Sequence, residues 1–316
     1  MSGRGSATAT VVAGPPLDEA RGIGALTLAA FLDDVRDRHG PREALVLDDP
    51  LLGGATVRRT YDDLHAEARR VARGLVAAGV EPGETVAVVM ANRPEAVAAL
   101  FGVALAGAIA ALVPTFAPRA EMAGLLDRSG ARVVLTQRRL GRRRLADDVA
   151  AARPGATVAA VGTGSWDDLL DGGTTTATRA QAAVPLRPAT DPDATALVIF
   201  TSGTTDRPKG VVHAHRSPCL QAWVQAGIFG RHHRTRMFSA LPLFWTAGLN
   251  TALGATLAAG GCWVMQETFA ADAALALMAR ERVTEPYVLP HQGAALAESD
   301  GWDAADLSSL TCVYGK

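Results

Sequence analysis

Cysteine is scarce in this chain of 316 residues, which has three: Cys219, Cys262 and Cys312. They are odd in number and far apart, so they form neither a disulfide framework nor the close ligand spacing of a zinc site. Such sparing use of cysteine fits a reducing compartment, and we expect a cytoplasmic protein.

An excess of charge is also lacking. The 31 basic and 32 acidic residues give a formal net charge of −1 at pH 7. A balanced surface gives no electrostatic reason to bind nucleic acid or an anionic membrane, so we expect neither partner. The segment Arg138–Arg144 contains five arginines, and its expected meaning is a solvated helix face.

One uncharged segment, Ala96–Val113, has a length that could span a bilayer. Much of it is alanine and glycine, which partition weakly into lipid. A buried helix at Pro94–Ala106 followed by a buried strand at Ala108–Val113 explains it better, so we expect no membrane span. The first residues lack the basic start and apolar core of a secretory signal, and residues 1–26 are expected to form a disordered tail.

Helical and strand patterns alternate along the rest of the chain. Thr60 is a predicted N-cap, apolar residues follow it at helical spacing, and Gly79 stands where a helix-ending glycine belongs. This alternation favours an α/β fold in which helices cover layers of parallel sheet. We therefore expect one large domain at 27–316, with an exposed connection at 172–193 that could divide it into subdomains. The expected strands are Glu84–Met90, Ala131–Thr136, Ala156–Val161, Thr195–Phe200, Thr235–Leu241, Cys262–Gln266 and Glu285–Pro290. The expected helices are Thr27–Arg38, Pro94–Ala106, Leu140–Ala152, Arg216–Phe229, Ala247–Ala259, Ala270–Arg282 and Gln292–Glu298.

The most informative segment is Thr201–Val212, which reads TSGTTDRPKGVV and follows the apolar run Thr195–Phe200. It predicts a bend between two buried strands that offers hydroxyls, backbone N–H groups and one lysine, as a polyphosphate requires. The alternative is an ordinary polar turn. A Walker loop is excluded, because Lys209-Gly210 is followed by two valines rather than by Ser or Thr opening a helix.

This loop resembles the signature of the adenylate-forming superfamily, which includes acyl-CoA synthetases, the adenylation domains of nonribosomal peptide synthetases, and firefly luciferase. The family pattern is close to [ST]SG[ST]TGxPKG[VA], and the chain departs from it at Asp206, where glycine is commonest. A carboxylate beside a triphosphate would be repulsive, so we expect Asp206 to face solvent. Weaker similarities extend over most of the chain, at Thr60–Leu64, Gly107–Pro114, Leu241–Leu249 and Leu307–Val313.

The resemblance implies a reaction and a set of site residues. A small-molecule carboxylic acid would be activated by ATP as acyl-AMP, and its acyl group would pass to CoA. Mg²⁺ would bridge phosphate oxygens. The residues implied to hold the phosphates are Thr201, Ser202, Gly203, Thr204, Thr205 and Lys209.

The resemblance also implies an acid pocket that includes Trp245, Thr246 and Gly248. Trp245 has two open interpretations, since a tryptophan among leucine and phenylalanine is usually part of the core. If it lines the pocket, its flat indole favours an apolar acid over a polar amino acid.

By resemblance, the adenine-binding segment and a small C-terminal domain with the catalytic lysine belong beyond Lys316, so the catalytic residue is unknown. Three hypotheses follow. The chain is a truncated acyl-CoA synthetase, an inactive nucleotide- or phosphate-binding module, or one half of a split adenylating enzyme with a separate C-terminal chain. The last includes adenylation of the peptide-synthetase type.

Two histidine pairs, His213 with His215 and His232 with His233, carry no carboxylate or cysteine at ligand spacing. We expect them to pack or to cap helices rather than to bind a metal.

Overall fold

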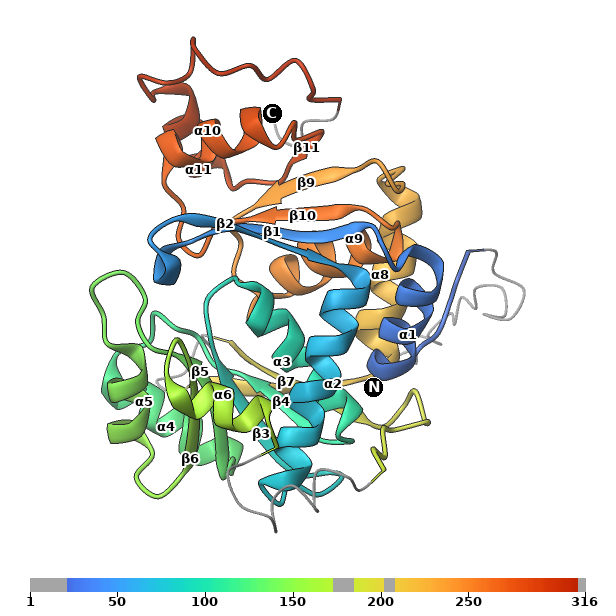
Figure 1. The fold of residues 1–316 in the computed structure, drawn as a ribbon, viewed down its shortest axis with the longest axis vertical. Helices are drawn as coiled ribbons and strands as arrows, with labels where there is room; N and C mark the ends of the chain where they lie inside the picture. Colours follow the sequence, from blue (N-terminus) through green and yellow to red (C-terminus); the bar gives the residue numbers. More distant parts are fainter. Residues whose placement is uncertain (1–21, 173–184, 202–207, 312–316) are drawn as a thin grey trace, which may run out of the picture.

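A computed structural model describes residues 22–172, 185–201 and 208–311 (Figure 1). Their strands form two sheets, one above the other in Figure 1. The five-stranded sheet has the order β11-β9-β10-β1-β2, and the six-stranded sheet has the order β6-β5-β3-β4-β7-β8. The strands are β1 Glu43–Asp49, β2 Ala55–Thr60, β3 Thr85–Val89, β4 Ile109–Leu112, β5 Val133–Gln137, β6 Thr157–Val161, β7 Thr195–Thr201, β8 Lys209–Ala214, β9 Arg236–Ser239, β10 Cys262–Met265 and β11 Glu285–Pro286.

Helices fill the space between the sheets and cover both outer faces (Figure 1). Those packed in the core between the sheets are α1 Leu28–His39, α2 Tyr61–Ala77, α3 Pro94–Leu105, α6 Gly164–Leu170, α8 Arg216–Ile228, the π-helix η2 Ala247–Gly254 and α9 Ala255–Ala258. The outer face of the six-stranded sheet carries α4 Arg119–Ser129 and α5 Leu145–Ala152, and that of the five-stranded sheet carries α10 Ala271–Arg280 and α11 Pro290–Ala297. The predicted fold of helix-covered sheet layers is confirmed.

Two antiparallel pairs interrupt the otherwise parallel sheets. β1 pairs antiparallel with β2 across the short 3-10 helix η1 Pro50–Leu52, and β7 pairs antiparallel with β8. The prediction that both strands flanking the Thr201–Val212 bend are buried is wrong for the second. β8 is the edge of its sheet, and Val211 and Val212 are 41% and 61% exposed.

Helix α2 illustrates how local sequence sets the fold. The Thr60 hydroxyl accepts a hydrogen bond from the Asp63 N–H, and the Asp63 carboxylate accepts one from the Thr60 N–H, so the predicted N-cap is a complete capping box. The apolar stripe at helical spacing is buried, and Gly79 follows the helix with φ of +79°. This helix therefore ends where a residue without a Cβ can take the left-handed conformation.

Two predicted helices differ from the structure. The helix expected from Leu140 begins at Leu145, because Leu140 and Arg143 exchange backbone hydrogen bonds in a tight turn with Gly141 at φ of +55°. The helix expected at Ala247–Ala259 is divided into η2 and α9. By contrast, the predicted succession of helix and strand in Ala96–Val113 is found as α3 and β4. Among the described residues, no helix is both long and apolar enough to cross a membrane.

The segments expected to be unstructured are only partly described. Within the expected tail 1–26, residues 1–21 lie outside the described part, whereas Ile23 and Leu26 pack against the core. Residues 173–184 of the expected connection also lie outside it, and 185–193 contain no helix or strand. A subdomain break there stays a prediction.

Candidate functional site

The β7–β8 hairpin brings together the two ends of the proposed phosphate loop. Thr201 ends β7, Lys209 begins β8, and the two are direct partners in the antiparallel register. Both are exposed, so a hydroxyl and an ammonium group stand side by side at the mouth of the bend. The other predicted loop residues, Ser202, Gly203, Thr204 and Thr205, and with them Asp206, lie outside the described residues.

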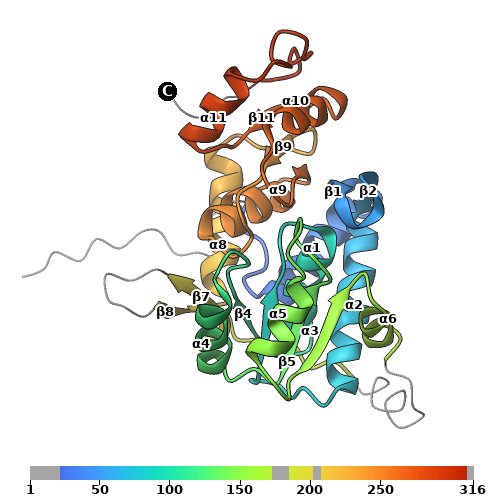
Figure 2. The same cartoon turned by 90° about the vertical axis from the view of Figure 1, so that its left-hand side faces the viewer.

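The hairpin emerges at the edge of the sheet where parallel strands end. β3, β4 and β7 are adjacent and parallel, so their following loops meet at one edge, the usual position of ligand sites in α/β folds. Figure 2 shows β7 and β8 projecting beside α4. Between them lies a hollow of about 330 Å³, here called the hairpin cavity, which is lined by Thr201 and Pro208 and also by Glu121, Trp245 and Thr246.

A second hollow of about 280 Å³, here called the aromatic cavity, adjoins the first. Phe116 and Trp245 line both. The aromatic cavity continues between the loops after β3, β9 and β10, where Phe244 and Phe269 supply much of the wall. The arrangement therefore provides a polar mouth next to an apolar chamber.

Trp245 stands between the two cavities and is 39% exposed. Its ring lies 6.1 Å from that of Phe116 and 6.3 Å from that of Phe244, in edge-to-face geometry. Those two phenylalanine rings are 5.4 Å apart. This geometry favours a wall residue over a core residue, although its role in holding an acid stays a prediction.

Gly248, predicted as a pocket residue, lies in η2 and does not line either cavity. A Cβ at this position would lie 2.0 Å from the carbonyl oxygen of Pro242 and 2.7 Å from that of Leu241. The absence of a side chain therefore lets η2 pack directly on the backbone that carries Trp245.

We expect Gly248→Ala to lower the unfolding midpoint, at a cost of about 1–3 kcal/mol, because backbone atoms must move to admit the methyl group. Thermal unfolding followed by circular dichroism measures this. Gly227→Ala is the matched control, since a Cβ there meets nothing within 4 Å and alanine is the better helix former. Equal midpoints for the two variants would contradict the packing role of Gly248.

Asn92, at the end of β3, joins the two sheets. Its side chain is buried and donates hydrogen bonds to the carbonyl oxygens of Leu241 at 2.9 Å and Gln266 at 3.3 Å. Its Oδ1 accepts one from the N–H of Leu243 at 2.9 Å. The backbone leading to Trp245 is thus fixed by the loop of the opposite sheet.

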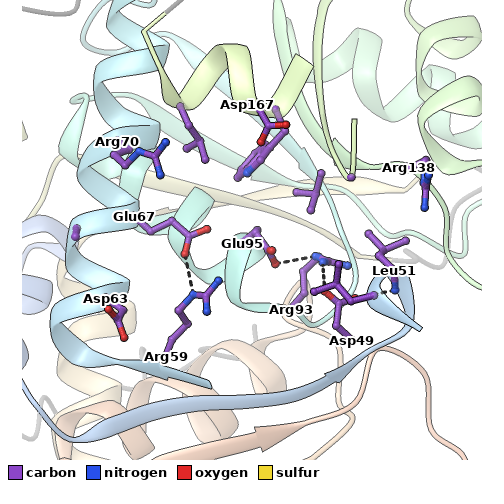
Figure 3. A pocket seen from close by; sticks show the side chains of 16 residues that line it. Asp49, Leu51, Arg59, Asp63, Glu67, Arg70, Arg93, Glu95, Arg138 and Asp167 are labelled. Carbon is purple, nitrogen blue, oxygen red and sulfur yellow. Dashed lines mark hydrogen bonds and ion pairs between the residues drawn. The ribbon is translucent and has the colours of Figure 1, made fainter. Parts of the chain in front are cut away.

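The neighbouring Arg93 is the centre of a buried ionic cluster (Figure 3). Its guanidinium, 1% exposed, contacts Asp49 at 2.9 Å, Glu95 at 2.9 Å and Glu267 at 2.6 Å. One guanidinium thus forms ion pairs with three carboxylates, and these are contributed by β1, by the first turn of α3 and by the loop after β10. Burial is the largest influence on the pKa of Glu267 and raises it, while Arg93 opposes the rise.

On the other side of this cluster lies a hollow of about 610 Å³, whose charged lining is seen in Figure 3. Glu67 and Arg59 contact each other there at 3.4 Å. Burial, and then the nearby Glu95, raise the pKa of Glu67. Acidic side chains such as Asp63 and Asp167 and basic ones such as Arg70 and Arg138 share its lining with apolar residues, so this hollow is not divided into a polar and an apolar part.

Two of the histidines in the predicted pairs, His215 and His232, accept hydrogen bonds from backbone N–H groups. His215 is buried, and its Nδ1 accepts a hydrogen bond from the N–H of Leu28, which caps the start of α1. Burial lowers its pKa. Among the described residues, no three His, Cys, Asp or Glu side chains gather as a metal site.

Sequence reasoning missed Asn92, Arg93 and Glu267. Asn92-Arg93-Pro94 follows an apolar strand, and polar residues at a strand end are a usable signal. Asn92 and its partner Leu241 are 149 positions apart, and Arg93 and Glu267 are 174 apart, which no local pattern reveals.

Comparisons with known proteins give consistent results. The family model described as AMP-binding enzyme matches residues 32–315. A feruloyl-CoA synthase of Amycolatopsis is 30% identical over 79% of this chain and 48% of its own length. The phosphinothricin tripeptide synthetase PhsC of Streptomyces viridochromogenes is 35% identical over 60% of this chain and 16% of its own length.

Among solved structures, the inhibitor-bound N-terminal domain of FACL13 from Mycobacterium tuberculosis matches with a TM-score of 0.74 and 26% identity. The match covers 91% of this chain and 69% of that one. The chain spans about half the length of the feruloyl-CoA synthase that it matches.

Proposed function

Because the chain belongs to the AMP-binding enzyme family, we propose that it activates a carboxylic acid with ATP as acyl-AMP and takes part in transfer of the acyl group to CoA. The observation that carries this proposal is the pairing of Lys209 with Thr201, which together with Trp245 lines the hairpin cavity. Its polar mouth suits phosphate, and its apolar chamber suits an acyl group. The setting that we propose is the cytoplasm.

In the first half-reaction, a carboxylate oxygen of the acid attacks the α-phosphorus of ATP. A new bond forms between that oxygen and phosphorus, the bond from the α-phosphorus to the bridging oxygen breaks, and pyrophosphate leaves. Two anions must meet in line, so the main task of the protein is to position them and to offset their charge. Lys209 offers a mobile point charge for the departing phosphates, and Thr201 offers a hydrogen-bond donor.

In the second half-reaction, the thiol sulfur of CoA attacks the acyl carbon, the thiol proton is lost, and AMP leaves. Mg²⁺, when bound, supplies charge neutralisation through phosphate oxygens. In the described part of the hairpin cavity, Glu121 is the one carboxylate in the lining, so the donor set fits a metal held mainly by the nucleotide. We propose that Trp245 and Thr246 contact the acyl part of the acid. Gly248 would contribute indirectly, by letting η2 pack against the backbone before Trp245.

Three alternatives follow from these comparisons. The similarity to the peptide synthetase PhsC keeps adenylation of the peptide-synthetase type open, with a carrier-protein thiol as acceptor. The chain spans about half of the feruloyl-CoA synthase, which leaves room for a split enzyme with a separate C-terminal chain, or for an inactive nucleotide-binding module.

Acid-dependent exchange of labelled pyrophosphate into ATP tests the proposal. We expect exchange by the chain, or by the chain joined to the remaining length of its relatives. Exchange that appears only when a second chain is added would identify a split enzyme. Nucleotide binding with no exchange in any form would identify an inactive module, and the lack of both would remove the function.

A further inference from the structure

The hollow of about 610 Å³ beside Arg93, here called the hairpin–α2 hollow, is separate from the two cavities of the proposed function. In the described part of the chain it shares no lining residue with the hairpin cavity or the aromatic cavity. Its wall combines the β1–β2 hairpin with α2, α6 and the start of α3. A hollow of this size suits a small molecule, and acid activation does not use it.

Two carboxylates in this wall are only partly satisfied by cations. Glu67 extends from α2 and Glu95 from α3, and both line the hollow (Figure 3). The contact from Arg59 Nε to Glu67 Oε2 is 3.4 Å, which is long for a hydrogen bond. Glu95 accepts one hydrogen bond from Arg93, whose charge is divided among three carboxylates. Burial and then the charge of Glu95 raise the pKa of Glu67, so a cation between the two glutamates would be favourable.

The remaining arginines of the wall leave these glutamates available. Arg70 pairs with Asp171 at 3.1 Å, and Asp171 does not line the hollow. Arg138 lies on the far side of the hollow from Glu67 in the view of Figure 3. As far as the structure describes the chain, neither arginine forms an ion pair with Glu67 or Glu95.

A buried hydrogen-bond donor opens to the same hollow. Trp166 lines it and is 4% exposed. The indole N–H groups of Trp223 and Trp263 donate to carbonyl oxygens, whereas that of Trp166 has no acceptor among residues 22–172, 185–201 and 208–311. In those residues the fully buried side-chain atoms without a partner are Gln225 Oε1 and Asn250 Oδ1. The N–H of Trp166 is therefore accessible from the hollow, and a buried indole N–H is normally paired.

The rest of the wall is apolar. Leu51, Leu52, Val161 and Leu170 line it, and Leu52 is 61% exposed. An apolar group held in the hollow would cover part of this leucine and remove its surface from water. The wall thus offers a place for a cation, a donor for one acceptor, and a surface for an apolar body.

We propose that the hairpin–α2 hollow is a second ligand site, which binds an organic ammonium ion that carries a neutral hydrogen-bond acceptor beside the ammonium group and an apolar body. The ammonium group lies between Glu67 and Glu95, the acceptor takes the N–H of Trp166, and the body packs on the leucines. An amino alcohol has this chemistry. It has no carboxyl group to activate, so this inference is independent of the proposed function.

Isothermal titration of the 316-residue protein near neutral pH with three matched compounds tests this inference. They are phenylalaninol, phenethylamine, which lacks the hydroxymethyl group, and phenylpropanol, which lacks the amino group. We expect phenylalaninol to bind about tenfold or more tightly than phenylpropanol, and about fivefold more tightly than phenethylamine. Equal dissociation constants for all three, or no binding of any, would overturn the assignment.

Glu67→Gln preserves the shape of the side chain and removes its charge. The affinity for phenylalaninol and phenethylamine should fall about tenfold, and that for phenylpropanol should stay unchanged. Glu298→Gln is the matched control, because Glu298 is exposed at the end of α11 and makes the same change in net charge. An equal loss of amine binding in both variants would reduce the effect to general electrostatics and overturn the site.

Two aromatic variants locate the ligand. Trp166→Phe keeps a ring but removes the N–H, so the advantage of phenylalaninol over phenethylamine should fall to about onefold. Trp245→Phe changes the aromatic cavity and should leave amine binding unchanged. Loss of amine binding in Trp245→Phe but not in Glu67→Gln would place the amine in the aromatic cavity and overturn the proposal.

Discussion

Replacement of Lys209 by alanine is expected to slow pyrophosphate exchange by about ten- to a thousandfold, the usual effect of one electrostatic group in a transition state. Lys209 is exposed and begins β8 opposite Thr201, so its ammonium can reach phosphate oxygens without disturbing the core. The loss should fall mainly on the turnover number, because charge moves onto the departing pyrophosphate during reaction. The measurement is the exchange rate at saturating ATP.

Two controls separate chemistry from folding. Thermal unfolding of Lys209→Ala should match that of the parent chain, because an exposed side chain at a sheet edge contributes little to stability. Arg144→Ala removes another exposed cation, 82% accessible and distant in sequence from the hairpin, and should leave exchange unchanged. An unaltered rate in Lys209→Ala would remove this residue from the phosphate site.

The second large effect is expected at Arg93. Arg93→Met keeps much of the side-chain volume but leaves the buried carboxylates of Asp49 and Glu267 without their cation. Breaking a buried ion pair in this way costs about 3–5 kcal/mol. We expect the unfolding midpoint to fall by roughly 10 °C at neutral pH.

The pH dependence of this difference checks its cause. Burial already raises the pKa of Glu267, and loss of the opposing Arg93 raises it further above the unfolded-state value, so the penalty exists at neutral pH. It should shrink as pH falls toward the unfolded-state pKa of a carboxyl, about 4, because protonation then removes the buried charge. Arg132→Met is the control. Arg132 is 63% exposed and pairs with Glu84, and such surface pairs contribute about 0–1 kcal/mol. A gap between the two variants that does not depend on pH would exclude the electrostatic explanation.

Local chemistry explains what could be predicted from sequence. The capping box at Thr60, the glycine at Gly79 and the strand before Thr201 depend on neighbours within a few positions, so the pattern alone predicts them. The β1–β2 hairpin was not foreseen. Its turn uses two consecutive glycines, Gly53 and Gly54, with φ of +69° and +88°. Two consecutive glycines between apolar segments are a turn signal, so this strand pair is predictable from local sequence.

Long-range contacts explain the remainder. The exposure of β8 depends on its place at the sheet edge, which strand composition does not specify. The site residues Arg93 and Glu267 are 174 positions apart. Arg93 follows β3 of one sheet and Glu267 follows β10 of the other, so only the packing of the two sheets brings them together. For Trp245, its two phenylalanine neighbours and its exposure favour the wall interpretation that composition left open.

Asn92 has a consequence for how ligands enter. One amide bonds to three backbone groups around Leu241, Leu243 and Gln266, so a hinge opening between the sheets would have to break all of them. These hydrogen bonds therefore hold the two sheets together at this point. Trp245 makes none of them, and 39% of its surface is exposed to solvent. We therefore expect a ligand to pass from the hairpin cavity to the aromatic cavity by rotation of the Trp245 side chain, which takes picoseconds to nanoseconds for an exposed residue, rather than by separation of the sheets.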